Sequence, residues 1–174
     1  DAGPGETFCE VGCGTGRNLV KAARRYPASH WYGVDPSAAM LRSAEANLRR
    51  ARLHARVALA PAEAATLDPA THLDLAEPLD GVWFSYALSM IPDWRPAVDH
   101  ALAITRPSGR IHAVDFGDLE GLPPWFRRLL TAWLARFGVH RKPEIAAYFR
   151  ELAGRGYGQR SEEHTSELQS PSAI

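Results

Sequence analysis

The stretch Glu10–Asn18, "EVGCGTGRN", constrains the fold more than any other part of the sequence. Its three glycines, at positions 12, 14 and 16, follow the apolar segment Thr7–Val11, which predicts a buried strand that ends in a tight turn. A helix is expected directly afterwards, from Arg17 to Tyr26, because Pro27 cannot continue it. Strand, glycine turn and helix in this order are typical of nucleotide-binding α/β sheets.

Strand and helix patterns alternate along the rest of the chain. Apolar runs predict further strands at 30–35, 55–60, 79–86 and 110–116. Helices are expected up to residue 52 behind a Ser37 cap, and at 94–104, 124–137 and 143–153. Residues 61–78 are predicted to be a loop with at most one helical turn, and "RPSG" at 106–109 a turn. The fold class predicted is α/β, a doubly wound and mostly parallel sheet with helices on both faces.

The end of the chain differs in composition from everything before it. Residues 160–174 are rich in Ser, Glu, Thr and Gln, and they resemble the translation of a sequencing-library adapter. We therefore expect one domain over residues 1–159 and a non-native, disordered tail at 160–174. A natural disordered tail is the alternative.

Charge and cysteine content narrow the function classes. Without the tail, 19 basic side chains face 17 acidic ones, or 20 if Arg160 is kept, and this excess is too small to indicate a nucleic-acid partner but is compatible with an anionic membrane surface. Cys9 and Cys13 lack further Cys or His at zinc spacing, so no metal site is expected. Two cysteines without a disulfide framework are consistent with the reducing cytoplasm.

Glu10 distinguishes between two ligand classes for the glycine turn. The spacing is G-x-G-x-G, one residue shorter than the dinucleotide pattern, and a carboxylate two residues before Gly12 would repel a pyrophosphate. S-adenosylmethionine carries a sulfonium and an α-ammonium instead, both of which a carboxylate attracts. The residues thus favour a cationic nucleoside over NAD, and a dehydrogenase is disfavoured.

Two further acids follow the next two predicted strands. Asp35 lies about 20 residues after the turn, where a carboxylate can accept hydrogen bonds from both ribose hydroxyls. Glu63, in "APAEA", is placed to accept a hydrogen bond from the adenine amino group. A turn or cap role for Asp35 and a solvated position for Glu63 are the alternatives.

The motif "EVGCGTG", with Asp35 and Glu63, resembles the seven-strand S-adenosylmethionine-dependent methyltransferase family over residues 8–157. The resemblance implies S-adenosyl-L-methionine as cofactor and a Rossmann-like sheet. The family fold ends in two antiparallel strands, so we expect a sheet truncated before them and a domain incomplete at both ends. The cofactor-binding residues expected are Glu10, Gly12, Cys13, Gly14, Gly16, Asn18, Asp35, Pro36, Met40, Glu63 and Ser85.

A narrower resemblance lies beyond the fourth predicted strand. "SYALSMIPDW" (85–94), "GTGRN" (14–18), "VDFGD" (114–118) and "PPWFRRLLTAWLARF" (123–137) are similar to the diacylglycerylhomoserine N-methyltransferases of betaine-lipid synthesis. This resemblance implies three methyl transfers to the amine of a homoserine-headed lipid. The alternatives are a methyltransferase that acts on another lipid amine, a quinone precursor or a small molecule, and a catalytically silent domain that binds a nucleoside.

Methyl transfer to a neutral amine depends on alignment more than on a strong base. Aromatic side chains and a few acceptors at the strand ends are therefore the expected chemistry. Tyr86 and Asp115 are the candidate catalytic residues, able to orient or deprotonate the amine. The substrate-binding candidates are Tyr86, Ser89, Met90, Trp94 and Phe116, with Trp94 equally suited to the core.

The predicted helix Pro124–Phe137 combines aromatic residues with Arg127, Arg128 and Arg136. It is either a peripheral membrane contact or an ordinary helix packed on the sheet. The expected location is cytoplasmic, with a peripheral contact at the inner membrane face in the first case. The partner expected is a lipid or small-molecule amine acceptor, and the oligomeric state is not predicted.

Overall fold

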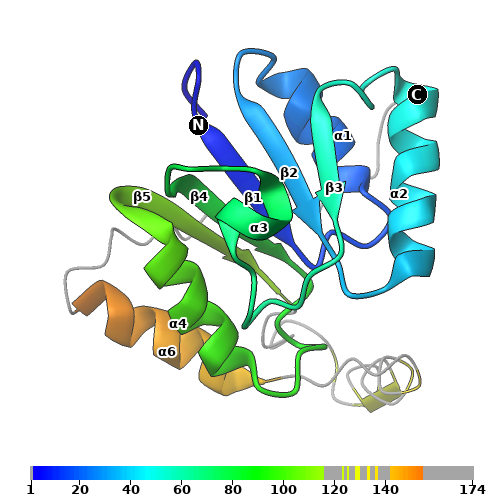
Figure 1. Ribbon diagram of the computed structural model, residues 1–174. Helices are drawn as coiled ribbons and strands as arrows, with labels where there is room; N and C mark the ends of the chain where they lie inside the picture. Colours follow the sequence, from blue (N-terminus) through cyan, green and yellow to red (C-terminus); the bar gives the residue numbers. More distant parts are fainter. Residues whose placement is uncertain are drawn as a thin grey trace. The chain divides into compact units, whose positions relative to one another are not determined.

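The computed structural model describes residues 2–115 and 142–154, and between them only positions 123, 125, 128, 129, 133 and 136. The chain divides into two compact units, Asp1–Asp115 and Phe116–Ile174, each of which is treated by itself. The first unit contains the sheet and the described residues of the candidate site (Figure 1).

Five parallel strands form the sheet, in the order β3-β2-β1-β4-β5. The order reverses between β1 and β4, which makes this a doubly wound α/β sheet and confirms the predicted fold class. The carboxyl ends of β1, β2 and β4 therefore meet at one edge, where the glycine turn lies. The strands are β1 (Thr7–Val11), β2 (His30–Val34), β3 (Val57–Ala60), β4 (Leu79–Ser85) and β5 (Thr105–Val114).

The helices lie on both faces of this sheet. The chain steps outwards from β1 to β3 through α1 and α2, then returns past β1 and continues to β5 through α3 and α4. Right-handed crossovers in opposite directions place α1 and α2 on one face and α3 and α4 on the other, as Figure 1 shows. The bounds are α1 (Arg17–Arg25), α2 (Ala38–Ala51), α3 (Pro69–Leu73) and α4 (Trp94–Ile104), with α6 (Pro143–Gly154) in the second unit.

Local chemistry explains where the helices begin and end. Ser37 caps α2 by accepting a hydrogen bond from the Met40 N–H, as its position before an apolar stripe predicted. Arg52 closes α2 in a left-handed conformation, with φ of 61°. Asp68 caps the five-residue α3, which is the single helical turn expected in the 61–78 loop.

The turn predicted at Arg106–Gly109 is instead a bulge inside β5, and this prediction was wrong. Leu79 pairs with Thr105 and Gly81 with Arg110, so Asp80 alone faces the four residues between them. Its carboxylate forms an ion pair with Arg106, one of these four residues, and also accepts the Thr7 N–H of β1 at 2.6 Å. Strand β3 also begins two residues later than predicted, at Val57.

Aromatic packing fills the core on the α1 and α2 face. Phe8 and Trp31 are each 1 % exposed and stack with ring centroids 5.0 Å apart. Trp83 meets Trp31 edge-on at 5.1 Å, an arrangement that the ring quadrupoles favour. Neighbouring strands β1, β2 and β4 thus share one continuous aromatic contact.

Several predictions fall outside the described residues. They include Phe116, the 160–174 tail and most of the 124–137 helix, of which Trp125, Leu129 and Trp133 are described as exposed. The helix predicted at 143–153 is confirmed as α6. Within the described part of the chain, no helix has the length and apolar character needed to cross a bilayer.

Gly33 in β2 offers a test of how tightly α1 packs on the sheet. A Cβ added there would lie 2.4 Å from Leu19 Cδ1 and 2.9 Å from Leu59 Cδ2. We expect Gly33→Ala to lower the free energy of unfolding by about 1–3 kcal/mol, the usual cost of overpacking. Urea unfolding measures it, with Gly3→Ala as control, whose Cβ would meet only the flexible Glu6 side chain at 3.2 Å. Equal stability of both variants would contradict the described packing.

Candidate nucleoside-binding site

The glycine turn follows β1 and has left-handed backbone at all three glycines, with φ of 71° at Gly12, 52° at Gly14 and 69° at Gly16. This conformation explains the choice of residue, since side chains with a Cβ are strained there. Its amides point inwards: Gly12 and Cys13 donate to the Val34 carbonyl at 2.9 and 3.0 Å. Gly16 donates to the Cys13 carbonyl at 2.9 Å. These amides are thus already used within the protein rather than offered to a phosphate.

Asp35 connects the turn to the next strand. Its Oδ2 accepts the Gly14 N–H at 2.9 Å, and its Oδ1 accepts the Ser37 N–H at 2.8 Å. The residue is 8 % exposed at the carboxyl end of β2. Each carboxylate oxygen has a second lone pair, so the group can hold the turn and still accept hydrogen bonds from a ligand. The turn role considered for Asp35 from the sequence is thus present in the structure, and its role in binding the ribose remains a prediction.

Small residues and one amide support the turn from other elements. A Cβ on Gly12 would lie 2.7 Å from Ala87 Cβ, and one on Gly16 would lie 3.0 Å from Ala44 Cβ. The Asn47 amide donates to the Thr15 carbonyl at 3.0 Å. Sequence reasoning missed these supports. The available signal was a polar Asn47 one residue before the buried Leu48 of α2.

Glu10 is a buried carboxylate in this region, with only 2 % of its surface exposed. The Asn18 amide donates to its Oε1 at 3.1 Å, while Oε2 is buried without a hydrogen-bond partner. Burial raises the pKa of Glu10 to about 7, against the opposing effect of the Asn18 amide. A buried acceptor without a partner costs free energy, so it favours a ligand that supplies a donor or a positive charge.

These residues fit S-adenosyl-L-methionine better than a dinucleotide. The unpartnered Glu10 oxygen suits the α-ammonium or sulfonium, and the inward-facing amides leave little to bind a pyrophosphate. Asp35, at the end of β2, has the position from which a carboxylate binds ribose hydroxyls.

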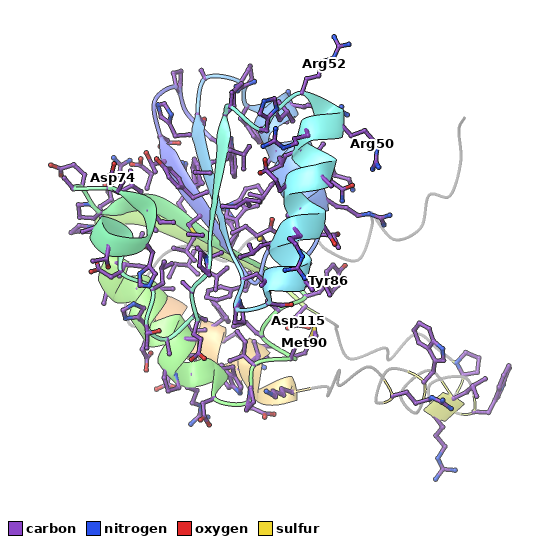
Figure 2. The ribbon with its side chains drawn as sticks, turned by 45° about the vertical axis from the view of Figure 1, so that its right-hand side comes forward. Arg50, Arg52, Asp74, Tyr86, Met90 and Asp115 are labelled. Carbon is purple, nitrogen blue, oxygen red and sulfur yellow. The ribbon has the colours of Figure 1, made fainter. Side chains whose placement is uncertain are left out.

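The residues predicted to bind the methyl acceptor lie beside this region, in the segments that follow β4 and β5. Tyr86 is 40 % exposed, with φ of 56°, and its N–H donates to the Val114 carbonyl at 2.7 Å. Asp115 Oδ2 accepts the Ser89 N–H at 2.7 Å, which fixes the loop after β4 to the end of β5. Figure 2 shows Tyr86, Met90 and Asp115 near one another at this edge.

Of the remaining predicted site residues, some are buried and others are exposed to solvent. Trp94 is 5 % exposed at the start of α4, which is the core position considered for it. Ser89 is buried, and its hydroxyl has no hydrogen-bond partner. Cys13 is buried, and burial raises the pKa of its thiol to about 12, so it remains protonated. Pro36, Met40 and Glu63 are exposed, and Ser85 is half-buried.

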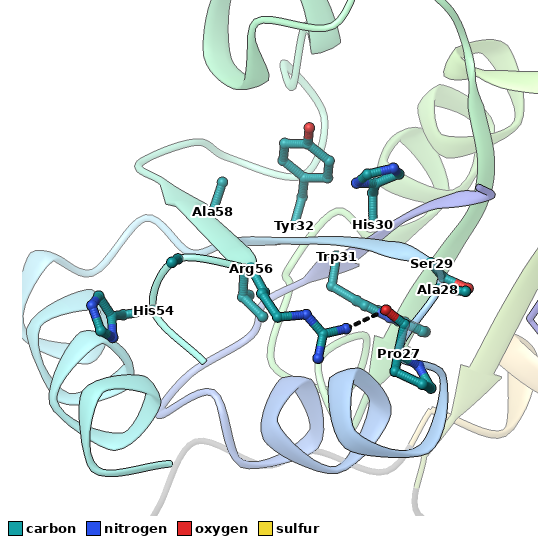
Figure 3. Close-up of a pocket in the computed structure, with 11 residues that line it drawn as sticks. Pro27, Ala28, Ser29, His30, Trp31, Tyr32, His54, Arg56 and Ala58 are labelled. Carbon is teal, nitrogen blue, oxygen red and sulfur yellow. Dashed lines mark hydrogen bonds between the residues drawn. The ribbon is translucent and has the colours of Figure 1, made fainter. Parts of the chain in front are cut away.

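A cavity of about 390 Å³ lies elsewhere, at the amino ends of β2 and β3 (Figure 3). His30, His54 and Arg56 contribute to its lining, and Arg56 donates to the Pro27 carbonyl. This cavity contains none of the predicted site residues. In the described part of the chain, no group of three or more His, Cys, Asp or Glu side chains could hold a metal ion.

The fold and the turn together define a Rossmann-like nucleoside-binding sheet of the methyltransferase class. The family model described as "Methyltransferase domain" matches residues 8–109, from β1 into the bulge of β5. The chain belongs to this methyltransferase-domain family.

Among curated proteins, the chain is similar to the trans-aconitate 2-methyltransferase of Methylobacterium radiotolerans. The two are 31 % identical over 157 residues, which is 83 % of this chain and 55 % of the relative. The chain thus spans about half the length of this relative.

Solved methyltransferase structures share the fold at low sequence identity. A putative methyltransferase from Bacillus halodurans superposes with a TM-score of 0.67 at 18 % identity, over 88 % of this chain and 63 % of its own. A methyltransferase from Geobacter sulfurreducens in complex with S-adenosyl-L-homocysteine superposes with a TM-score of 0.52 at 18 % identity, over 63 % and 41 % of the two chains.

Asp35 and Glu63 can be compared directly by mutation. We expect Asp35→Ala to weaken S-adenosylhomocysteine binding by roughly ten-fold or more, because it removes charge-assisted hydrogen bonds and releases the Gly14 and Ser37 amides. Glu63→Ala should have a smaller effect, because its side chain is exposed. Calorimetry measures both, and equal affinities would show that Asp35 does not bind the ribose.

The pKa of Glu10 predicts a pH dependence of binding. Between pH 5 and about 7 the free carboxyl is largely protonated, whereas a cationic ligand favours the carboxylate, so binding must release a proton. The affinity for S-adenosylhomocysteine should therefore rise with pH, by up to roughly ten-fold per unit, and level off near pH 7. Its α-ammonium remains charged over this range.

Calorimetry in buffers of different ionisation enthalpy detects the released proton. Glu10→Gln should bind more weakly and show no such rise, while the control Glu63→Gln keeps it. A rise that persists in Glu10→Gln would assign the titration to another group.

Proposed function

We propose that this chain is an S-adenosylmethionine-dependent N-methyltransferase whose acceptor is the homoserine amine of diacylglycerylhomoserine. Three successive transfers would give a trimethylated betaine lipid. The proposal rests on the acidic character of the acceptor side, on the resemblance of residues 85–94 to that subfamily, and on membership of the methyltransferase-domain family.

The charge of the acceptor side is the observation that favours an amine. The loop Ser85–Trp94 contains no Lys, Arg or His, and it includes Asp93. Asp115 is held at the end of β5 by the Ser89 N–H, so one negative charge is fixed beside the exposed Tyr86. This arrangement attracts an ammonium and repels a polycarboxylate.

When bound, S-adenosyl-L-methionine supplies an activated methyl group on a positively charged sulfur. The chain's own residues would do the remaining work. Glu10 and Asp35 would hold the cofactor, and the Tyr86 ring would lie against a nitrogen that gains permanent charge with its third methyl. Asp115 would orient the amine and accept its proton before each transfer. Alignment of amine and methyl group would supply most of the acceleration.

A carboxylate acceptor is the second candidate, and the sequence relative supports it. That protein is named for trans-aconitate and is 31 % identical to this chain. A tricarboxylate needs cations to bind it, and loop 85–94 has none. We therefore place the amine first.

Turnover with defined acceptors separates the two candidates. Formation of S-adenosylhomocysteine is measured with diacylglycerylhomoserine in micelles, with a short-chain soluble analogue, and with trans-aconitate. We expect methylation of both homoserine compounds, with mono-, di- and trimethylated products resolved by mass spectrometry. Turnover of trans-aconitate alone would replace our first candidate with the second.

Asp115→Asn provides the matched variant, because it removes the charge and keeps an oxygen that can accept the Ser89 N–H. We expect its kcat/KM for the amine to fall by roughly ten-fold or more while S-adenosylhomocysteine affinity stays unchanged. Unchanged amine turnover would exclude Asp115 from the acceptor site. The membrane contact expected of residues 124–137 remains a prediction.

A further inference from the structure

The basic side chains of the first unit are concentrated on one face of the sheet. Residues 17–56, which contain α1 and α2, hold nine Lys or Arg and two acids, a net charge of +7. All nine cations are exposed. They are Arg17, Lys21, Arg24, Arg25, Arg42, Arg49, Arg50, Arg52 and Arg56, and we call them the basic face.

The two acids of this segment do little to neutralise the basic face. Asp35 is buried and bound to the Gly14 and Ser37 amides. Glu45 is paired with Arg49 at 2.7 Å, within α2. The exposed charge of α1 and α2 is therefore almost entirely positive.

The other face of the sheet has the opposite charge. Residues 57–104, which include α3 and α4, hold seven acids and one cation, Arg95. Six of these acids are exposed, and the seventh, Asp80, is buried and paired with Arg106. Figure 2 shows Arg50 and Arg52 extending from α2 on one side, with Asp74 on the other. The unit thus has two faces that respond oppositely to a charged surface.

The arrangement of the cations indicates an extended partner. Arg17, Lys21 and Arg24 are spaced four and three residues apart, so they form one stripe along α1. Arg42 and Arg49 form a second stripe, seven residues apart on α2, which packs beside α1. A compact anion would require convergent donors, whereas two adjacent stripes of separate charges match a plane of negative charge. The two stripes run from the glycine-turn edge of the sheet towards its opposite edge.

We propose that the basic face binds the anionic surface of a lipid bilayer, with the acidic face turned to water. This inference rests on the proposed lipid acceptor, because it would bring the acceptor edge to the membrane that contains the substrate. Each cation near an anionic surface adds to binding, and the effect weakens as salt rises.

The test is co-sedimentation of the full chain with phosphatidylcholine vesicles, with and without phosphatidylglycerol. We expect binding only to the anionic vesicles and a loss of it at high salt. The triple variant Lys21→Gln, Arg24→Gln, Arg42→Gln should bind roughly ten- to hundred-fold more weakly. The charge-keeping variant Arg24→Lys, Arg42→Lys should bind like the unchanged chain. Urea unfolding of each variant verifies that these exposed positions leave the fold intact.

A second triple variant removes the same charge elsewhere, with Arg127, Arg128 and Arg136 changed to Gln. Equal binding of both triple variants, or a loss confined to the second, would overturn the inference. Preferential binding to duplex DNA at the same salt would also overturn it.

Methylation of the soluble short-chain analogue is measured in parallel. Turnover without vesicle binding would contradict only the proposed membrane binding of the basic face. Vesicle binding without turnover of any amine would contradict only the proposed N-methyltransferase function.

Discussion

The carboxylate of Asp35 is the interaction on which the rest of the site depends. It joins the turn after β1 to the start of α2, two segments that are more than twenty residues apart in sequence. Without it, Gly14 and Ser37 would each lose an acceptor at the same buried point. Asp35 and Val34 accept hydrogen bonds from the amides of the turn, and the Asn47 amide donates to its Thr15 carbonyl, so these hydrogen bonds help to set its shape. The ligand-binding surface is thus built from groups that already bind each other.

Glu10 contrasts with Asp35, although both acids lie at the carboxyl ends of adjacent strands. Asp35 has backbone donors on both oxygens, whereas Glu10 has one amide donor and one oxygen without a partner. A buried carboxylate with a donor on each oxygen stabilises the fold, and one with an oxygen that lacks a donor carries a free-energy cost that a ligand can relieve. Asp35 therefore holds the turn, whereas Glu10 is the residue expected to attract a cationic ligand.

The sequence predicted most of the fold because its local signals agree. The strand Thr7–Val11 and the helix Trp94–Ile104 have the predicted bounds, and Ser37 caps α2 as expected. The turn expected at Arg106–Gly109 failed for a long-range reason, since Asp80 on β4 holds those residues inside β5. The supports of the glycine turn were missed for the same reason. Ala44, Asn47 and Ala87 come from other elements, and only the tertiary packing brings them to the turn.

The contact between Gly12 and Ala87 also limits which substitutions this site can tolerate. Position 12 belongs to the glycine turn and position 87 to the loop after β4, and a single added methyl group at Gly12 would already overlap with Ala87. The two loops are therefore sterically coupled. The loop after β4 can change at Tyr86 or Met90, which are exposed, but a larger residue at 87 would displace the glycine turn. Changes of substrate in proteins with this packing should therefore keep a small residue at 87, or accept weaker binding of the methyl donor.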